Sequence, residues 1–212
     1  MLLNKNKAFE LIKLLNKSIK NPKTSLKYRN RFTLLTSVVL SAQCTDVNVN
    51  NVTKNIYKKY YTPEHFVDLG INKIKNLIKS IGLFNNKAKN LYYLSKILLE
   101  KHQSKVPNKF EELILLPGVG RKTANVVLNA VFNKPTIAVD THVFRVGNRT
   151  GLSNGKNPEQ VENQLLKILP KKYLKKSHHL ILLHGRYICK AIRPLCNSCV
   201  IKRICLYKEK YE

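Results

Sequence analysis

Apolar residues recur at intervals of three and four positions along most of the chain. This spacing gathers side chains on one face of an α-helix. It is clearest in four segments, Phe32, Leu35, Val39 and Ala42; Ile71, Ile74, Ile78 and Ile81; Ala124, Val127, Leu128 and Val131; and Val161, Leu165 and Ile168. The alternation typical of strands is confined to residues 136–139, a stretch too short to build a sheet. The pattern therefore predicts an all-α protein.

Proline and glycine mark the breaks between the helical segments, because neither residue continues a helix well. They fall at Pro63, Gly70, Gly82, Pro107, Pro117-Gly118, Pro135, Gly151 and Pro158. We therefore expect about nine or ten short helices. The turn at residues 133–135 divides the chain into a middle part and a C-terminal part, and the first 23 residues could pack with either.

The composition permits one large domain or two small ones, since 43% of the 212 residues are apolar. The 39 Lys and Arg residues outnumber the 12 Asp and Glu residues, which gives a formal net charge of +27. A surplus of this size favours a polyanionic partner, and nucleic acid is the first candidate. Part of the surplus has another explanation, because 31 of the basic residues are lysines, a bias typical of AT-rich coding. The charge supports nucleic-acid binding without defining the fold.

No segment of the sequence is expected to enter or cross a membrane. Lys and Glu interrupt the apolar positions of the first 17 residues, which argues against a signal peptide, and no run of about 18 apolar residues occurs. We expect a cytoplasmic protein, associated with the nucleoid if the source is bacterial. In that reducing compartment the five cysteines are not expected to form disulfides.

Four of the five cysteines lie close together near the C-terminus. Cys189, Cys196, Cys199 and Cys205 follow the spacing C-x6-C-x2-C-x5-C. Four thiolates within 17 residues can hold a tetrahedral metal ion or a cubane iron–sulfur cluster. On spacing alone, an all-cysteine zinc site stays open. The fifth cysteine, Cys44, lies in an apolar helical segment and is expected to be a small buried side chain.

A short turn between two helical segments is a candidate phosphate-binding site. Residues 110–131 read FEELILLPGVGRKTANVVLNAV, so one helix runs into a P-G-V-G turn and a second begins near Arg121. Gly118 and Gly120 permit positive φ and close approach of another backbone. The free N–H groups at the start of the second helix can bind an anion. Taken alone, the same residues would also suit an ordinary tight helix–helix turn.

Two charged residues near this turn are candidates for catalysis. Lys122 lies in the first turn of the second helix, where the helix dipole disfavours a positive charge and favours a neutral, nucleophilic amine. Asp140 follows residues 136–139 and precedes a helical segment, so we expect it to be an N-cap. By position alone, Lys122 is one solvated lysine among many and Asp140 is only a cap.

Together these segments resemble the endonuclease III family of DNA glycosylases. The matching motifs are L-P-G-V-G-R-K-T-A from Leu116, A-V-D-T-H from Ala138, S-A-Q-C-T-D from Ser41, I-G-L from Ile81, and the four cysteines after H-G-R-Y. The resemblance implies an all-α, two-domain helix-hairpin-helix fold. A six-helix domain is expected at residues 24–134, and a second domain, with the iron–sulfur cluster, at residues 1–23 and 135–212.

The resemblance also implies a role for each site residue. Lys122 attacks a damaged nucleotide and forms a Schiff base, after which β-elimination breaks the strand, and Asp140 is the second catalytic group. Gln43 fills the gap left by the extruded nucleotide, and Leu83 wedges into the base stack. The implied contacts to the DNA backbone are Gly118, Gly120, Arg121, Lys190 and Arg193. The four cysteines hold one 4Fe-4S cluster.

The implied activity is removal of oxidised pyrimidines from double-stranded DNA and cleavage of the resulting abasic site, by a monomer. Two alternatives share part of the pattern. An adenine-mismatch glycosylase has the hairpin, aspartate and cluster but lacks lyase activity; Lys122 and the absence of a further C-terminal domain count against it. A non-catalytic DNA-binding or electron-transfer iron–sulfur protein would not need Lys122, Asp140 and Gln43 together.

Overall fold

The computed structural model describes residues 1–209 and, within them, contains helices and connecting segments but no strand. The ten helices of this part of the chain are α1 Lys5–Ser18, α2 Arg31–Leu40, α3 Asp46–Lys59, α4 Pro63–Leu77, α5 Phe84–His102, α6 Phe110–Leu113, α7 Arg121–Phe132, α8 Thr141–Thr150, α9 Pro158–Ile168 and α10 Lys171–Tyr187. The predicted all-α fold is confirmed. Among the described helices, none is long and apolar enough to cross a membrane.

Polar residues define where most of the helices begin. The residue before the helix accepts a hydrogen bond from the backbone N–H three positions on at Asn4, Thr45, Thr62, Asp140 and Asn157. Helix α2 begins with a reciprocal pair, in which the Asn30 side chain accepts from the Thr33 N–H and the Thr33 hydroxyl accepts from the Asn30 N–H. These bonds satisfy donors that a helix leaves unpaired at its first turn.

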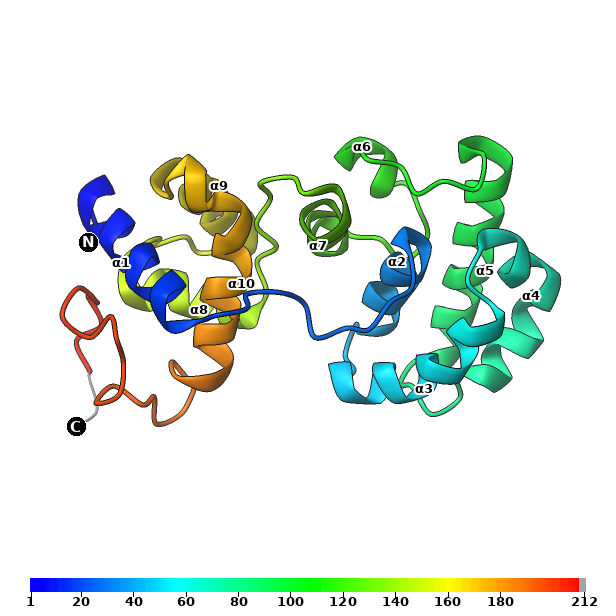
Figure 1. Cartoon of the computed structure of the whole chain (residues 1–212), viewed down its shortest axis with the longest axis horizontal. Helices are drawn as coiled ribbons and strands as arrows, with labels where there is room; N and C mark the ends of the chain where they lie inside the picture. Colours follow the sequence, from blue (N-terminus) through cyan, green and yellow to red (C-terminus); the bar gives the residue numbers. More distant parts are fainter. Residues whose placement is uncertain (210–212) are drawn as a thin grey trace. The chain divides into compact units, whose positions relative to one another are not determined.

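One compact unit comprises Ser25–Phe132 and holds the six helices α2 to α7, all of whose residues the structure describes (Figure 1). Helix α2 is central to this unit, because nine of its ten residues are buried and it contacts α3, α5 and α7. Helices α4 and α5 pack along each other. Apolar side chains from all six helices form a single core that supports the turn between α6 and α7.

The other compact unit joins the first 24 residues to the chain from Asn133 onwards. Its helices are α1, α8, α9 and α10, and α10 contacts both α1 and α8 (Figure 1). The backbone N–H of Leu3 donates to the Gly151 carbonyl at 2.8 Å. The N-terminal segment, which the sequence could not assign to either part, therefore packs with the C-terminal part of the chain. Residues 136–139 lead into α8 as a connection that is neither helix nor strand.

Candidate functional site

The hairpin, residues 110–132, consists of α6, a tight turn and α7. Backbone hydrogen bonds close the turn from the Leu116 N–H to the Leu113 carbonyl at 3.1 Å and from the Val119 N–H to the Leu116 carbonyl at 3.0 Å. Leu116 and Val119 are buried in the core of their unit. The two glycines on either side of Val119, Gly118 and Gly120, are exposed. The apolar residues of the turn therefore anchor it, and its glycine backbone faces solvent.

The lack of a side chain has a different structural effect at each of the two glycines of the turn. Gly118 has a φ of 78°, and a Cβ there would lie 2.9 Å from Asn90 Nδ2 and 3.1 Å from Val39 Cγ1. Any other residue at this position would be strained and would clash. Gly120 does not have a positive φ, and a Cβ there would meet nothing within 4 Å. Of the two glycines that permit positive φ, Gly118 adopts it, whereas Gly120 leaves open space at the start of α7.

Helix α7 begins with two exposed basic residues. Arg121 is its first residue, and the Arg121 Cζ atom lies 5.2 Å from the centre of the Phe110 ring. Lys122 follows in the first turn and is exposed. The first helical hydrogen bond runs from the Ala124 N–H to the Gly120 carbonyl at 3.0 Å. Because Lys122 is exposed, its amine is accessible to a ligand. It lies at a helix N-terminus, and such a terminus favours binding of an anion.

Two other exposed residues of the same unit, Gln43 and Leu83, have a left-handed backbone conformation. Gln43 lies in the turn after α2 and has a φ of 54°. Leu83 precedes α5, has a φ of 59° and is 56% exposed. Cys44, expected in a helix and buried, instead lies in the turn after α2 and is half-buried. The sequence pattern missed this because α2 ends at Leu40, before its apolar run does.

Asp140 belongs to the other unit, where it precedes α8. Its Oδ1 atom accepts a hydrogen bond from the Val143 N–H at 2.8 Å, so the predicted N-cap is confirmed. The carboxylate is partly buried. A cap of this kind fixes the aspartate side chain at the start of the helix and leaves its other oxygen available for a further interaction.

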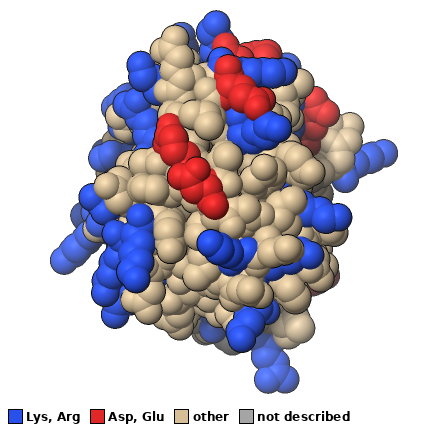
Figure 2. Space-filling view, turned by 90° about the vertical axis from the view of Figure 1, so that its right-hand side faces the viewer, with Lys and Arg blue, Asp and Glu red and all other residues tan. Residues whose placement is uncertain are grey.

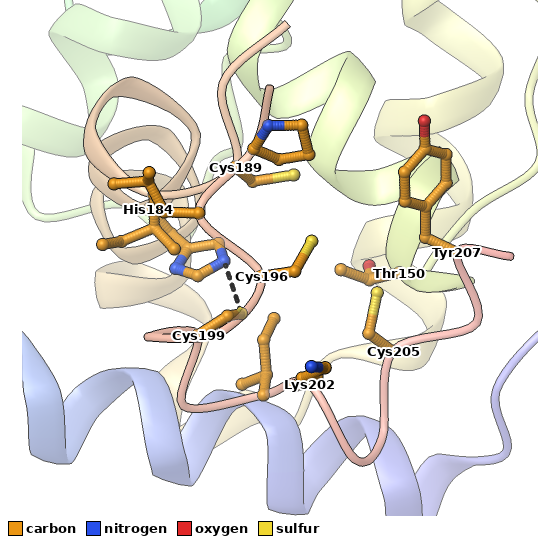
Figure 3. A pocket seen from close by; sticks show the side chains of 12 residues that line it. Thr150, His184, Cys189, Cys196, Cys199, Lys202, Cys205 and Tyr207 are labelled. Carbon is orange, nitrogen blue, oxygen red and sulfur yellow. Dashed lines mark hydrogen bonds between the residues drawn. The ribbon is translucent and has the colours of Figure 1, made fainter. Parts of the chain in front are cut away.

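The four C-terminal cysteines line one cavity (Figure 3). All four are partly buried, and the cavity is completed by residues of α8, α10 and the C-terminal segment, among them Thr150, His184, Ile201 and Tyr207. The Cys199 sulfur lies 3.6 Å from His184 Nε2. Burial lowers the pKa of His184 to about 4, so its ring is neutral at neutral pH.

Burial and the neighbouring cysteines both affect the ionisation of the Cys199 thiol in this cavity. Burial raises the pKa of the Cys199 thiol, and the charges of Cys205, Cys189 and Cys196 raise it further. Thiolates so close together repel one another unless a metal cation lies between them. Among the residues that the structure describes, no three His, Cys, Asp or Glu side chains are arranged around a point that could hold a single metal ion. The four cysteines share the lining of this one cavity.

Two arginines of α8 hold the backbone that carries these cysteines. Arg145 Nε donates to the Cys189 carbonyl at 3.0 Å, and its Nη2 atom donates to the Gly185 carbonyl at 2.9 Å. One turn later, Arg149 donates to the Lys190 carbonyl at 2.6 Å and to the Ala191 carbonyl at 2.9 Å. Irregular backbone needs such partners for its carbonyls. The role of these arginines was not predicted from the sequence, although their spacing of four residues on a helix places them on one face.

The segment between the first two cysteines is exposed. Lys190 and Arg193 both lie on the surface, and Arg193 has a φ of 48°. Ile192, between them, is 81% exposed. This segment therefore presents two cations on a backbone that Arg149 holds.

The net charge is not spread evenly over the surface. On the face shown in Figure 2, Asp and Glu side chains gather in the upper part, while Lys and Arg side chains lie mainly around its margin. A polyanion would be attracted to only part of this face. The net charge alone therefore does not locate a DNA-binding surface. That surface has to be inferred from the positions of particular residues.

The family model of the HhH-GPD superfamily of base excision DNA repair proteins matches residues 36–171 of the chain. That range contains the hairpin, Gln43, Leu83 and Asp140. The all-helical fold and this match define the class of protein, a base excision DNA repair protein of the helix-hairpin-helix superfamily.

The most informative relatives cover almost the whole chain. The endonuclease III of Rickettsia conorii is 57% identical over 202 residues, which are 95% of this chain and 95% of the relative. That of Escherichia coli strain K12 is 50% identical over 210 residues, 99% of this chain and 100% of the relative. The structure also matches endonuclease III in a trapped covalent DNA intermediate, an estranged-adenine complex, with a TM-score of 0.90, 43% identity and coverage of 96% of both chains.

A non-covalent endonuclease III–DNA complex matches equally well, with a TM-score of 0.90 and 43% identity over 96% of both chains. The chain belongs to the endonuclease III family. It is a base excision repair enzyme, a bifunctional DNA glycosylase and abasic-site lyase, and it binds DNA.

Proposed function

We propose that this enzyme removes oxidised pyrimidines from double-stranded DNA and cleaves the abasic site through a Schiff base on Lys122. The observation that carries the proposal is the exposed amine of Lys122 in the first turn of α7, directly after the turn that Leu116 and Val119 anchor. A rigid turn holds the nucleophile in place, and its exposure gives a flipped-out nucleotide access to it.

The proposed reaction follows from the chemistry of a primary amine. The Lys122 nitrogen bonds to the sugar C1′ as the bond from C1′ to the base breaks, and the base leaves with a proton. The sugar ring then opens, which gives a protonated Schiff base. Removal of a proton from C2′ breaks the C3′–O bond and releases the 3′ strand, and water frees the lysine. Asp140 stabilises the positive charge that develops on the sugar.

We assign the DNA contacts of the hairpin unit to two groups of residues. Gly118, Gly120 and Arg121 surround the N-terminus of α7, where backbone N–H groups and a cation favour a phosphate. Gln43 and Leu83 are exposed at the ends of two other segments. Gln43 hydrogen-bonds to the orphaned base, and Leu83 occupies the stack, which offsets part of the cost of extruding the nucleotide.

The cysteine cavity is proposed to hold one 4Fe-4S cluster through Cys189, Cys196, Cys199 and Cys205. The donor set fits, because the four cysteines line one cavity and iron–sulfur clusters are held by four cysteine thiolates. The bound cluster supplies coordination bonds that crosslink the C-terminal segment. Lys190 and Arg193 then contact DNA phosphates from the loop between the first two ligands.

The two compact units correspond, in this proposal, to two domains of a monomer, the six-helix domain at residues 24–134 and the cluster domain formed by residues 1–23 and 135–212. Each carries one of the two catalytic groups, Lys122 in the first and Asp140 in the second. The proposal therefore requires both domains for turnover.

The test of the proposal is borohydride trapping with wild-type protein on three duplexes that carry a thymine glycol, an abasic site or an adenine mispaired with guanine. We expect a covalent complex and a cleaved strand on the first two duplexes and neither on the third. An adenine-mismatch glycosylase would instead release adenine from the third duplex without a trapped complex. Failure to process both the thymine-glycol and abasic duplexes would contradict the proposed function.

A further inference from the structure

Lys87 is almost completely buried in a protein whose other lysines are mostly exposed. It lies in the first turn of α5, four residues after Leu83, and only 4% of it is exposed. Removing an ammonium group from water is costly unless acceptors in the protein replace the lost water. Burial accordingly lowers the pKa of Lys87, and the neighbouring Cys44 partly offsets this shift. A lysine in such a place is expected to have a specific acceptor.

That acceptor is the backbone of the turn that carries Gln43. Lys87 Nζ donates a hydrogen bond to the Ala42 carbonyl oxygen at 2.6 Å. The peptide group between Ala42 and Gln43 is planar, so a bond that orients the carbonyl also orients the N–H of Gln43. Gln43 has a φ of 54°, in the left-handed region that is unfavourable for a residue with a Cβ. The bond from Lys87 therefore helps to hold Gln43 in a strained conformation.

The main chain of Lys87 reaches the other exposed segment. Its N–H donates to the Leu83 carbonyl at 3.1 Å, the bond that closes the first turn of α5. Leu83 also has a positive φ, and more than half of its side chain is exposed. One residue thus contacts the segment of Gln43 through its side chain and the segment of Leu83 through its backbone.

A second bridge joins the same two segments. Asn48 Nδ2 lies 3.3 Å from the Cys44 sulfur and 3.3 Å from the Ser80 carbonyl oxygen, as donor to both. Cys44 follows Gln43 in the chain, and Ser80 lies shortly before Leu83. Two independent contacts therefore connect the turn after α2 to the loop before α5, within a single compact unit.

We propose that Lys87 is a positioning residue that holds Gln43 and Leu83 in one fixed arrangement, so that both enter the base stack together when a damaged nucleotide is extruded. This inference rests on the proposed roles of Gln43 and Leu83. Its physical basis is preorganisation, because a segment that is already ordered does not lose conformational entropy on binding. Without the Lys87 bond, the turn at Gln43 has other conformations available, and part of the binding free energy is spent on ordering it.

The first test is a double-mutant cycle between Lys87→Met and Gln43→Ala, with single-turnover excision of thymine glycol from duplex DNA as the readout. Lys87→Met keeps the length of the side chain and removes the donor. We expect it to slow excision about tenfold, and Gln43→Ala to cause little further loss in that background, since the effects of coupled residues are not additive. Additive losses would overturn the inference.

The matched control is Lys96→Met on the same helix. Lys96 forms a surface ion pair with Glu100 at 3.7 Å, with about half of each side chain exposed. Such pairs contribute little to stability. We therefore expect Lys96→Met to leave excision unchanged and to be additive with Gln43→Ala, so coupling in this control would show that the cycle reports a nonspecific effect and would overturn the inference.

A second readout separates positioning from folding. A single-stranded oligonucleotide with an abasic site has no orphaned base and no duplex stack to enter. Borohydride trapping on this substrate should therefore proceed at the wild-type rate in Lys87→Met, while trapping on duplex slows. Equal losses on both substrates would mean that Lys87 only supports the fold, and the inference would be wrong.

Lys87→Arg tests the same point if the methionine variant does not fold. It restores a cationic donor but is bulkier, so a positioning role predicts recovery of part of the duplex rate and a packing role predicts further loss. The proposed function fails separately: if Gln43→Ala and Leu83→Ala leave duplex excision unchanged in otherwise wild-type protein, their assigned roles are wrong whatever Lys87 does.

Discussion

The hairpin and the cysteine-bearing segment after α10 hold their candidate DNA contacts in place by different means. The hairpin consists of two helices and the turn between them. Two buried apolar residues, Leu116 and Val119, anchor this turn in the core of its unit. The cysteine loop, residues 188–207, contains turns but no helix, and side chains of α8 donate to its backbone carbonyls at Cys189, Lys190 and Ala191. Packing therefore fixes the first region, whereas the second relies on hydrogen bonds and, in the proposed function, on coordination of the cluster.

This difference has a consequence for function. A turn fixed by core packing is already ordered before DNA binds, so it can place a nucleophile accurately. A loop fixed by a bound metal group is ordered only when that group is present. We therefore expect substitutions in the hairpin to separate chemistry from stability, and substitutions in the cysteine loop to change order and DNA binding together.

The largest effect is expected for Lys122→Gln. The side chain is exposed, so its replacement should leave the melting temperature unchanged, yet without the amine no Schiff base forms. Trapping on thymine-glycol and abasic duplexes should fall below detection, while damaged DNA still binds. Lys96→Gln is the matched control, and a melting temperature lowered together with activity would contradict the separation of chemistry from stability in the hairpin.

Asp140→Asn should slow turnover by about 10²-fold or more, the usual loss when a major electrostatic group is removed. Asparagine is also a good N-cap, so the bond from the Val143 N–H should persist and stability should change little. Excision rates and thermal unfolding of the same preparations check both parts. A rate near that of the wild type would leave Asp140 with its capping role alone.

Cys196→Ser should have an intermediate effect, on order rather than on chemistry. Wild-type protein prepared without oxygen should contain about four iron atoms per chain, and the variant should lose them. Backbone hydrogen exchange should then increase in residues 188–207 and stay unchanged in α2, α5 and α7. DNA binding should weaken about tenfold, because Lys190 and Arg193 lose their support. Stoichiometric zinc in the wild type would contradict the cluster assignment.

Replacing the two glycines of the hairpin with alanine should affect different properties, the stability of the protein at Gly118 and its DNA affinity at Gly120. Gly118→Ala should destabilise the protein by about 2 kcal/mol, since it combines a positive φ with a Cβ placed 2.9 Å from Asn90 Nδ2. Gly120→Ala meets no atom within 4 Å and should change stability by less than about 0.5 kcal/mol. We nevertheless expect it to weaken DNA binding, because the added methyl group would lie in the proposed phosphate site at the start of α7. Denaturant unfolding and DNA titration measure the two effects.

The smallest effect is expected for Arg193→Ala. A phosphate contact carries little information about bases, so binding to duplexes of different sequence should weaken by a similar factor of roughly 3–10. The dependence of affinity on salt should become shallower by about one released counterion. A loss restricted to one sequence would indicate a base contact instead. Lys208→Ala, exposed beyond the cysteine loop, provides the comparison.

Features that depend on local chain geometry could be predicted from the sequence. The helical period, the cap at Asp140 and the α6–α7 turn each involve residues within a few positions of one another. Contacts between distant residues could not be predicted in this way. Lys87 and Ala42 are 45 residues apart, and Arg149 and Lys190 are 41 apart. Nothing in the local pattern distinguishes Lys87 from the exposed lysines around it; only the folded core does.

Gly120 illustrates a different limit. Both glycines of its motif permit a positive φ, and the sequence does not show that only Gly118 adopts it. The backbone conformation of the turn after α2 could not be predicted either. The apolar run through Ala42 favoured a longer helix, but α2 ends at Leu40. In both cases tertiary packing, rather than residue type, decides the backbone conformation.

The most direct test of the central claim is to identify the residue that forms the covalent bond. Wild-type protein is trapped with borohydride on a thymine-glycol duplex, digested, and the peptide that carries the sugar remnant is sequenced by mass spectrometry. The sequence contains 31 lysines, and we predict that the remnant is on Lys122 alone. A remnant on any other lysine or on the N-terminal amine would contradict the assignment of the nucleophile to the hairpin.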